Sequence, residues 1–273
     1  MRKRGRRFFP EMQRRLFVCK CLLGLVMAAT NVVANEEVTV IAHRGASADA
    51  PENTRASIAE AVRVGAPVIE FDVRATADGT LVLFHDDNLE RITGRKGSVE
   101  TNDWKVIREL DVGSWFDGGE FDEEKPMLLA DAIKLCLKGD STPLIEHKTG
   151  EAANYVKAIQ DLNAGEKVIL QSFNWDFLAE VQSLDSSIPL GALGSKELDA
   201  SRKTKISKLK PDWVGWKFSD FRDADLKWAK SRGFEVALWT VNDAKIASSW
   251  AEKGVSGIIT DKPAQMLQVL GDD

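Results

Sequence analysis

Two acidic residues lie inside an apolar stretch that has the composition of a buried β-strand. Glu70 and Asp72 are two positions apart in the sequence VIEFDV of residues 68–73. Successive side chains of a strand point to opposite faces, so both carboxylates project from one face and the apolar residues from the other. Two like charges about 5 Å apart repel each other by about 3 kcal/mol at an effective dielectric constant of roughly 20. A strand core tolerates such a pair only with a cation between the charges or with water around them, so the pair is a candidate cation site.

A histidine follows on the next apolar run. The turn Ala77-Asp78-Gly79 folds the chain back onto itself, and the link to residues 81–84 is too short for anything but a hairpin. Positions that face each other across this turn have residue numbers that add up to about 156. This register places His85 beside Phe71 and Asp72, and it predicts a local site within eighteen residues.

The elements that must hold these residues follow from the remaining pattern. Short apolar runs alternate with amphipathic helical stretches, which is typical of a parallel sheet with helical crossovers. Nine strands are expected, one of them the hairpin arm. The other eight match a TIM-type (β/α)8 barrel, with an open doubly wound sheet as the alternative. The expected strands are 38–42, 68–73, 81–84, 143–145, 168–170, 188–193, 213–218, 235–241 and 257–260, and expected helices include 54–64, 129–137, 152–162, 175–184, 224–231 and 244–252.

The carboxyl ends of barrel strands form the working face of such a fold, and polar residues follow several of the apolar runs there. Alternation puts Glu146 and Lys148 on one face of their strand and turns His147 toward the helices. With Glu70 and Asp72, Glu146 makes three carboxylates at one mouth. Oxygen ligands suit Mg²⁺, Ca²⁺ or Mn²⁺ better than Zn²⁺.

Two of the three histidines of the chain, His43 and His85, also fall at strand ends near these carboxylates. Histidine titrates near neutral pH, so such a pair can exchange the roles of general acid and general base. The alternatives are metal ligation and simple packing. We favour acid–base catalysis by His43 and His85, because three oxygen ligands already suffice for the metal. We expect His147, which lies on the other face of its strand, to be structural.

Arg44 and Lys148 add two cations to the same mouth. An arginine fork and a lysine point charge beside a divalent ion suit a small anionic group, and together with two histidines they suit phosphoryl chemistry. Salt bridges to the carboxylates are the simpler alternative. Trp239, at another strand end, would form a flat wall for an apolar or polyol group, or would simply pack in the core.

Two loop regions need separate interpretations. Asn53 or Thr54 is expected to cap the helix that follows, and capping alone explains that stretch. Residues 93–125 are rich in glycine and aromatic residues and have no expected strand. We interpret them as a cap insertion over the site, and a small packing subdomain explains them equally well.

The amino terminus resembles an export signal. Residues 1–20 carry eight basic residues and are followed by an apolar stretch that is too short to span a bilayer. We expect residues 1–34 to be a signal peptide and the mature domain to cover 35–273, which makes the protein periplasmic or secreted. Translation from Met12, a twin-arginine signal at residues 14–18 and an uncleaved anchor are the alternatives.

Charge restricts the partners. The whole chain has a net charge of −5, and loss of residues 1–34, with eight basic residues and Glu11, leaves −12. Such a surface repels phosphate polymers, which argues against nucleic acid. We expect a small-molecule substrate and no stable membrane insertion of the mature chain; the oligomeric state is not indicated.

Taken together, these motifs resemble the glycerophosphodiester phosphodiesterase family, and the match runs over essentially the whole mature chain. His147, in place of the usual apolar residue, and the sequence MLLAD at 127–131 depart from the family pattern. The matching pieces are His43-Arg44-Gly45, Pro51-Glu52-Asn53-Thr54, Glu70-Phe71-Asp72, His85-Asp86, Glu146 with Lys148, Trp239-Thr240-Val241-Asn242 and Thr260-Asp261-Lys262-Pro263.

The resemblance implies a TIM-type barrel with a cap after the hairpin, and hydrolysis of glycerophosphodiesters to glycerol 3-phosphate and an alcohol with Mg²⁺ or Ca²⁺ bound. It implies roles for seven residues. The resemblance makes Glu70, Asp72 and Glu146 metal ligands, His43 and His85 the acid–base pair, and Arg44 and Lys148 phosphate ligands. Three alternatives stay open: a phospholipase acting on lysophospholipids or phosphoinositides, a non-catalytic phosphate-ester binding protein, and a metal-dependent sugar isomerase.

Overall fold

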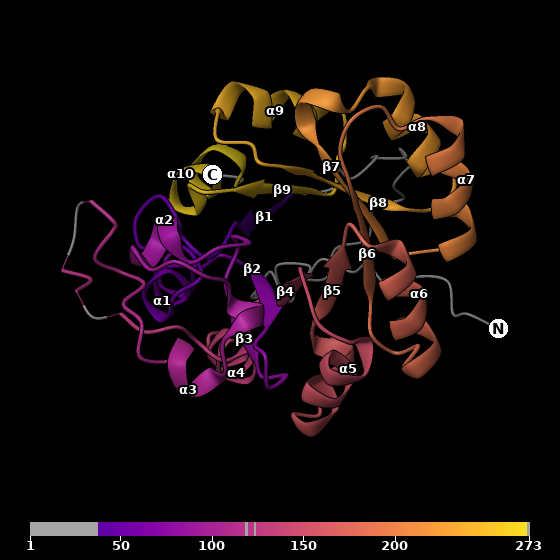
Figure 1. Ribbon diagram of the computed structural model, residues 1–273. Coiled ribbons are helices and arrows are strands. Elements are labelled where there is room, and N and C mark those ends of the chain that lie inside the picture. The colour runs from indigo at the N-terminus through magenta and orange to yellow at the C-terminus, as the bar shows by residue number, and fades with distance from the viewer. Residues whose placement is uncertain (1–37, 118–119, 123, 272–273) are drawn as a thin grey trace, which may run out of the picture.

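Eight parallel strands close into a barrel in the computed structural model, which describes residues 38–117, 120–122 and 124–271. The order is β1-β9-β8-β7-β6-β5-β4-β2, and β1 also pairs with β2, which closes the ring. Helices surround the strands (Figure 1). The predicted TIM-type barrel is therefore confirmed. The barrel strands are β1 (Thr39–Ala42), β2 (Val68–Ala75), β4 (Thr142–His147), β5 (Ile169–Ser172), β6 (Leu190–Gly194), β7 (Trp213–Lys217), β8 (Glu235–Trp239) and β9 (Gly257–Thr260).

The remaining strand, β3 (Leu81–Leu83), is the hairpin arm. It pairs antiparallel with β2, with Val73 opposite Leu83 and Ala75 opposite Leu81. These pairs follow the register that the turn predicts. The backbone N–H of Phe84 also donates to Asp72 O at 3.0 Å, which brings the next residue, His85, to the barrel mouth.

The inside of the barrel is filled by one apolar residue from each parallel strand, all buried. Because side chains alternate along a strand, the residues two and four positions further on also point inward, at the carboxyl end. Because of this alternation, the side chains of Glu70 and Asp72 point to the same side of β2 as Val68. In the same way, Glu146 points to the same side of β4 as Leu144. The inner layer consists of Ile41, Val68, Leu144, Ile169, Leu193, Trp213, Ala237 and Ile259.

The opposite faces of the strands pack against helices, and the six helices expected by range begin and end within one residue of their predicted bounds. Thr54 caps α1 as one of the two predicted candidates, and its hydroxyl accepts from the N–H of Ser57. Of the described helices around the barrel, α7 and α10 were not among those expected by range. The helices around the barrel are α1 (Arg55–Arg63), α4 (Leu129–Lys138), α5 (Ala152–Asp161), α6 (Trp175–Leu184), α7 (Ala200–Leu209), α8 (Asp223–Ser231), α9 (Ala244–Glu252) and α10 (Pro263–Leu270).

The described residues of the segment 93–125, here called the insertion, include the short helix α3 (Trp104–Ile107) and follow the short helix α2 (Glu90–Thr93) (Figure 1). Their apolar side chains form a second core with β3, separate from the barrel. This agrees with the packing-subdomain interpretation and leaves the role of a cap as a prediction. The cluster comprises Val82, Phe84, Leu89, Ile92, Val99, Ile107, Leu110 and Val112, with Trp104, Trp115 and Leu128 against it.

The predicted signal peptide, residues 1–34, lies outside the described residues. Among the residues that the structure describes, no helix has both the length and the apolar character that a membrane span requires.

Candidate active site

Three buried carboxylates meet at the carboxyl end of the barrel. Glu70 and Asp72 come from β2 and Glu146 from β4, where Asp72 and Glu146 are paired in register. One carboxylate oxygen of each lies within 4.8 Å of the others, and the three residues are 1%, 1% and 8% exposed. The predicted convergence of the three acids is thus confirmed as geometry.

Two of the three acids have protein counter-ions. Lys148 Nζ lies 2.5 Å from Glu146 Oε1 and 3.2 Å from Asp72 Oδ1, and Arg44 Nε lies 3.2 Å from Asp72 Oδ2. Although burial favours its neutral form, Lys148 and Arg44 hold the pKa of Asp72 well below its ordinary value. In turn, Asp72 and Glu146 outweigh burial and raise the pKa of Lys148.

Glu70 differs, because no ion pair to its side chain is found within the described ranges. Its Oε2 accepts the backbone N–H of Arg44 at 2.8 Å, but its buried Oε1 has no hydrogen-bond partner among them. Burial and the charges of Asp72 and Glu146 raise the pKa of Glu70 well above its ordinary value. Three carboxylates whose oxygens lie this close together, one of them without a hydrogen-bond partner, suit a hard divalent cation. These acids could therefore bind a metal.

The first histidine is oriented by an acid that directly follows the last barrel strand. Nδ1 of His43 lies 2.6 Å from Oδ1 of Asp261, and Oδ2 of Asp261 accepts from Asn242 at 2.5 Å. Although burial opposes it, these bonds and one from Ser47 hold the pKa of Asp261 at about 2. An ionised carboxylate only accepts, so Nδ1 of His43 carries a proton, and Nε2 is the unprotonated nitrogen of the neutral ring.

The second histidine is held in the same way from the other side of the mouth. Nδ1 of His85 lies 2.8 Å from Oδ1 of Asp86, which follows it in the chain. Burial lowers the pKa of His85, although the charge of Asp72 acts in the opposite direction. His43 and His85 both lie close enough to Asp72 to help lower the pKa of that acid, so the two imidazoles share one mouth with the carboxylates.

Arg44 reaches the site from a left-handed turn after β1. Its φ is +55° and that of Gly45 is +82°, and the guanidinium contacts Glu52 through Nη1 at 2.9 Å as well as Asp72. In this structure Arg44 and Lys148 form the salt bridges that sequence analysis gave as the simpler alternative. Both remain at the mouth, 18% exposed, where an anion can exchange with the carboxylates.

Comparisons with known proteins identify the family of the chain. The model of the glycerophosphoryl diester phosphodiesterase family matches residues 43–265. The chain belongs to this family. It is therefore an enzyme of the phosphodiesterase class.

Relatives from several organisms are similar over most of the chain. A glycerophosphodiester phosphodiesterase of Caldanaerobacter subterraneus is 32% identical, with 85% of this chain and 97% of the relative covered. Glycerophosphodiester phosphodiesterase 1 of Bos taurus is 35% identical, over 83% and 78%. A phosphodiesterase of Oleispira antarctica in complex with the product sn-glycerol-3-phosphate has a TM-score of 0.79 and 27% identity, covering 86% of this chain and 98% of that one. The resemblance to the family stated above is thereby confirmed.

Several residues of the phosphodiesterase site have no role in the sequence-based prediction. Asn53, expected only as a possible cap, donates from Nδ2 to Asp72 Oδ2 at 3.0 Å, and the N–H of Asp72 donates to Asn53 Oδ1 at 3.0 Å. Asp261 and Asp86 orient the histidines. Their positions directly after a strand or a histidine were the available signal, but alternation alone does not show which partner each one contacts.

His147 and Trp239 are the two remaining predicted positions. His147 points into the helix layer as expected, stacked on Phe177 at a centroid distance of 3.5 Å and bonded to Ser172 and Gly150 O. Trp239 is half-buried above the inner layer of the barrel and lies edge-on to Phe173 at 5.6 Å. Both the wall and the packing interpretations of Trp239 fit this placement.

A cavity of about 470 Å³ opens beside His85 and Lys148. Phe173, which is 47% exposed, lines it together with polar loop residues. This cavity adjoins the phosphodiesterase site through His85 and Lys148, and the three buried carboxylates are not part of its lining.

Proposed function

We propose that this phosphodiesterase hydrolyses glycerophosphodiesters to glycerol 3-phosphate and an alcohol, with His43 and His85 as the acid–base pair. The observation that carries the proposal is the pair of imidazoles, each bonded through Nδ1 to a carboxylate, at the mouth that also holds Arg44 and Lys148. The product found in the Oleispira antarctica relative supports the substrate class.

We also propose that Glu70, Asp72 and Glu146 hold Mg²⁺ or Ca²⁺. When bound, such an ion supplies positive charge to the phosphate oxygens and favours the five-coordinate phosphorus. The orphaned Oε1 of Glu70 and the all-oxygen donor set support this assignment.

The remaining steps belong to side chains of the chain itself. Arg44 and Lys148 turn from their carboxylates to the anionic diester and offset its charge. One histidine, with Nε2 unprotonated, takes the proton of the attacking hydroxyl; the other, protonated at Nε2, gives its proton to the leaving alkoxide. The attacking group is either water or the neighbouring hydroxyl of glycerol, and in the second case a cyclic phosphate appears as an intermediate.

The test measures release of glycerol 3-phosphate from a panel of soluble glycerophosphodiesters, with and without chelator. His43→Ala and His85→Ala are each expected to lower kcat by about 10²–10⁴-fold. His147→Asn is the matched control, since the third histidine packs in the helix layer: its thermal midpoint should fall while kcat stays near the wild-type value. Near-full turnover in both alanine variants would overturn the assignment. Release from lysophospholipid vesicles but not from soluble diesters would favour the phospholipase alternative.

We further propose that the protein is exported and that its mature form begins at Asn35. The basic amino terminus, the apolar stretch after it and Ala34 support this. Amino-terminal sequencing of the protein from the extracytoplasmic fraction tests it, and an intact Met1 or Met12 there would contradict it.

A further inference from the structure

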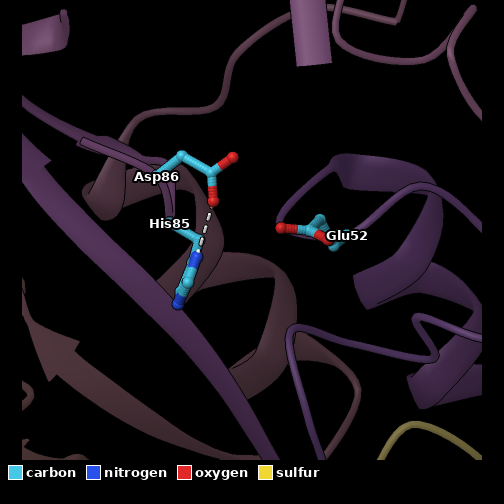
Figure 2. A group of neighbouring side chains, drawn as sticks. All are labelled: Glu52, His85 and Asp86. Carbon is cyan, nitrogen blue, oxygen red and sulfur yellow. Dashed lines mark hydrogen bonds and ion pairs between the residues drawn. The ribbon is translucent and has the colours of Figure 1, made fainter. Parts of the chain in front are cut away.

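A second group of ligating side chains lies at the edge of the site. Glu52, His85 and Asp86 each offer an atom within 4.8 Å of the others, and Figure 2 shows the carboxylates of Glu52 and Asp86 facing each other with His85 bonded to Asp86. This group does not need a metal ion. Guanidinium groups of Arg44 and Arg91 already occupy its carboxylate oxygens.

Arg91 binds both acids of this group with a fork. Its Nε and Nη2 lie 2.6 Å and 3.1 Å from the two oxygens of Asp86. Its Nη2 and Nη1 lie 2.7 Å and 3.3 Å from the two oxygens of Glu52. Paired contacts of this kind fix the orientation of a carboxylate as well as its charge, which a lysine cannot do.

Each of these acids makes one further contact that leads into the active site. Oδ1 of Asp86 accepts from Nδ1 of His85 at 2.8 Å, and Oε1 of Glu52 accepts from Nη1 of Arg44 at 2.9 Å. The guanidinium of Arg91 therefore connects the imidazole of His85, through Asp86, to the guanidinium of Arg44, through Glu52. The side chains of Glu52 and Asp86 are only 13% and 19% exposed, so water can replace little of what Arg91 supplies.

Arg91 itself is held from outside the barrel. It lies on α2, between the hairpin and the insertion, and its guanidinium carbon is 5.2 Å from the ring centroid of Trp115 in the insertion. Stacking on an aromatic face restricts the arginine and leaves its donors directed at the two acids.

We infer that Arg91 is a positioning residue for the phosphodiesterase reaction, which fixes His85 through Asp86 and Arg44 through Glu52. The inference rests on the proposed function, in which His85 transfers a proton and Arg44 contacts the phosphate. Without Arg91, two poorly solvated carboxylates lose their common counter-ion and are free to turn. The imidazole then loses its orientation, and Glu52 draws Arg44 away from the substrate.

Two double-mutant cycles test the inference. Arg91→Ala should lower kcat by about 10- to 100-fold, because displacements of about 1 Å in an acid–base group cost this much, and should also raise KM. In an Asp86→Asn background the further loss of kcat from Arg91→Ala should largely disappear, and in a Glu52→Gln background the further rise of KM should disappear. Arg91→Lys should lose kcat as well, since it keeps the charge without the fork.

The controls separate positioning from folding. Thermal midpoints are measured for every variant, and guanidinium chloride, at concentrations far below those that unfold the protein, should restore part of the kcat of Arg91→Ala where equal NaCl does not. Arg222→Ala is the matched control: Arg222 also contacts two acids, Asp225 and Glu197, away from the site. Its kcat and KM should stay near the wild-type values.

The outcomes also separate this inference from the function on which it rests. Losses that multiply in full in both cycles, without rescue by guanidinium, would show that Arg91 acts independently of the two acids and would overturn the inference even if His85→Ala is inactive. Full activity of His85→Ala would instead overturn the proposed function.

Discussion

At the scale of single residues, the carboxylate beside each imidazole decides which ring nitrogen carries the proton. Asp261 accepts from Nδ1 of His43 and is itself held by Asn242 and Ser47, so the ring has one stable tautomer. An amide in place of the acid can also donate a hydrogen bond to Nδ1, and it then stabilises the tautomer that carries its proton on Nε2.

Asp261→Asn is therefore expected to lower kcat by at least about tenfold, and at most by the 10²–10⁴-fold of a complete acid–base group. KM should change little, because Asp261 contacts His43 rather than the predicted phosphate ligands. Steady-state kinetics on glycerophosphocholine check this. An unchanged kcat would mean that the tautomer of His43 does not limit the reaction.

The same acid links folding to pH. Its pKa of about 2 in the folded protein lies below the value of about 3.9 that an aspartate has in an unfolded chain. The ionised form thus stabilises the fold fully above about pH 4, and this contribution is lost as pH falls toward 2. With 31% of the side chain exposed, we expect it to be worth about 2 kcal/mol at most.

Urea unfolding with chelator present measures this contribution. At pH 7 the free energy of unfolding of Asp261→Asn should lie below that of the wild type, and the difference should shrink as pH falls from 4 to 2. A constant difference over this range would show that the effect comes from packing rather than from the charge.

At the scale of elements, the turn between β1 and α1 aims Arg44 at the site. Gly45 has a φ of +82°, and a Cβ there would lie 2.6 Å from the carbonyl carbon of Ser57 in α1. Only glycine combines this conformation with so close an approach of the backbone. The capping box of Thr54 and Ser57 begins α1 at the same point, so the helix and the turn support each other.

Gly45→Ala is expected to destabilise the protein by about 1–3 kcal/mol, the cost of a strained residue, and to raise KM as Arg44 shifts. Thermal unfolding and KM should change together. Gly65→Ala is the control for backbone strain alone: its φ is +81°, but no atom lies within 4 Å of the added Cβ. A variant of Gly45 no less stable than that control would contradict the packing argument.

At the scale of the whole molecule, three buried acids in one barrel mouth are expected to make the stability of the fold depend on divalent cations. Their mutual repulsion weakens the metal-free protein, and any ion that binds only the folded state stabilises it. At a Mg²⁺ or Ca²⁺ concentration a hundred times the Kd, the gain is about 2.7 kcal/mol. The thermal midpoint should therefore rise by several degrees.

Glu70→Gln should remove this shift. In chelator the variant should be at least as stable as the wild type, because it lacks the carboxylate whose pKa burial raises most clearly. Differential scanning calorimetry in chelator, Mg²⁺ and Ca²⁺ provides the measurement. An equal thermal shift in Glu70→Gln and wild type would show that the ion binds elsewhere.

Much of the fold follows from the spacing of apolar and polar residues along the sequence. Alternation along a strand is local, so it predicted that Glu70 and Asp72 share a face and that His147 turns away from it. The turn at Asp78-Gly79 set the hairpin register, and the repeated strand–helix units predicted a parallel sheet, because a parallel strand pair requires a crossover. The pairing of β1 with β2 decided that this sheet closes into a barrel rather than staying open.

The contacts that orient these residues were decided only by the tertiary structure. His43 meets Asp261 across 218 positions of the chain, and Arg91 meets Glu52 across 39. Such pairs depend on the closure of β1 against β9 and on the packing of the insertion beside the mouth. No local period encodes them, since each results from the summed geometry of all the strands between its partners.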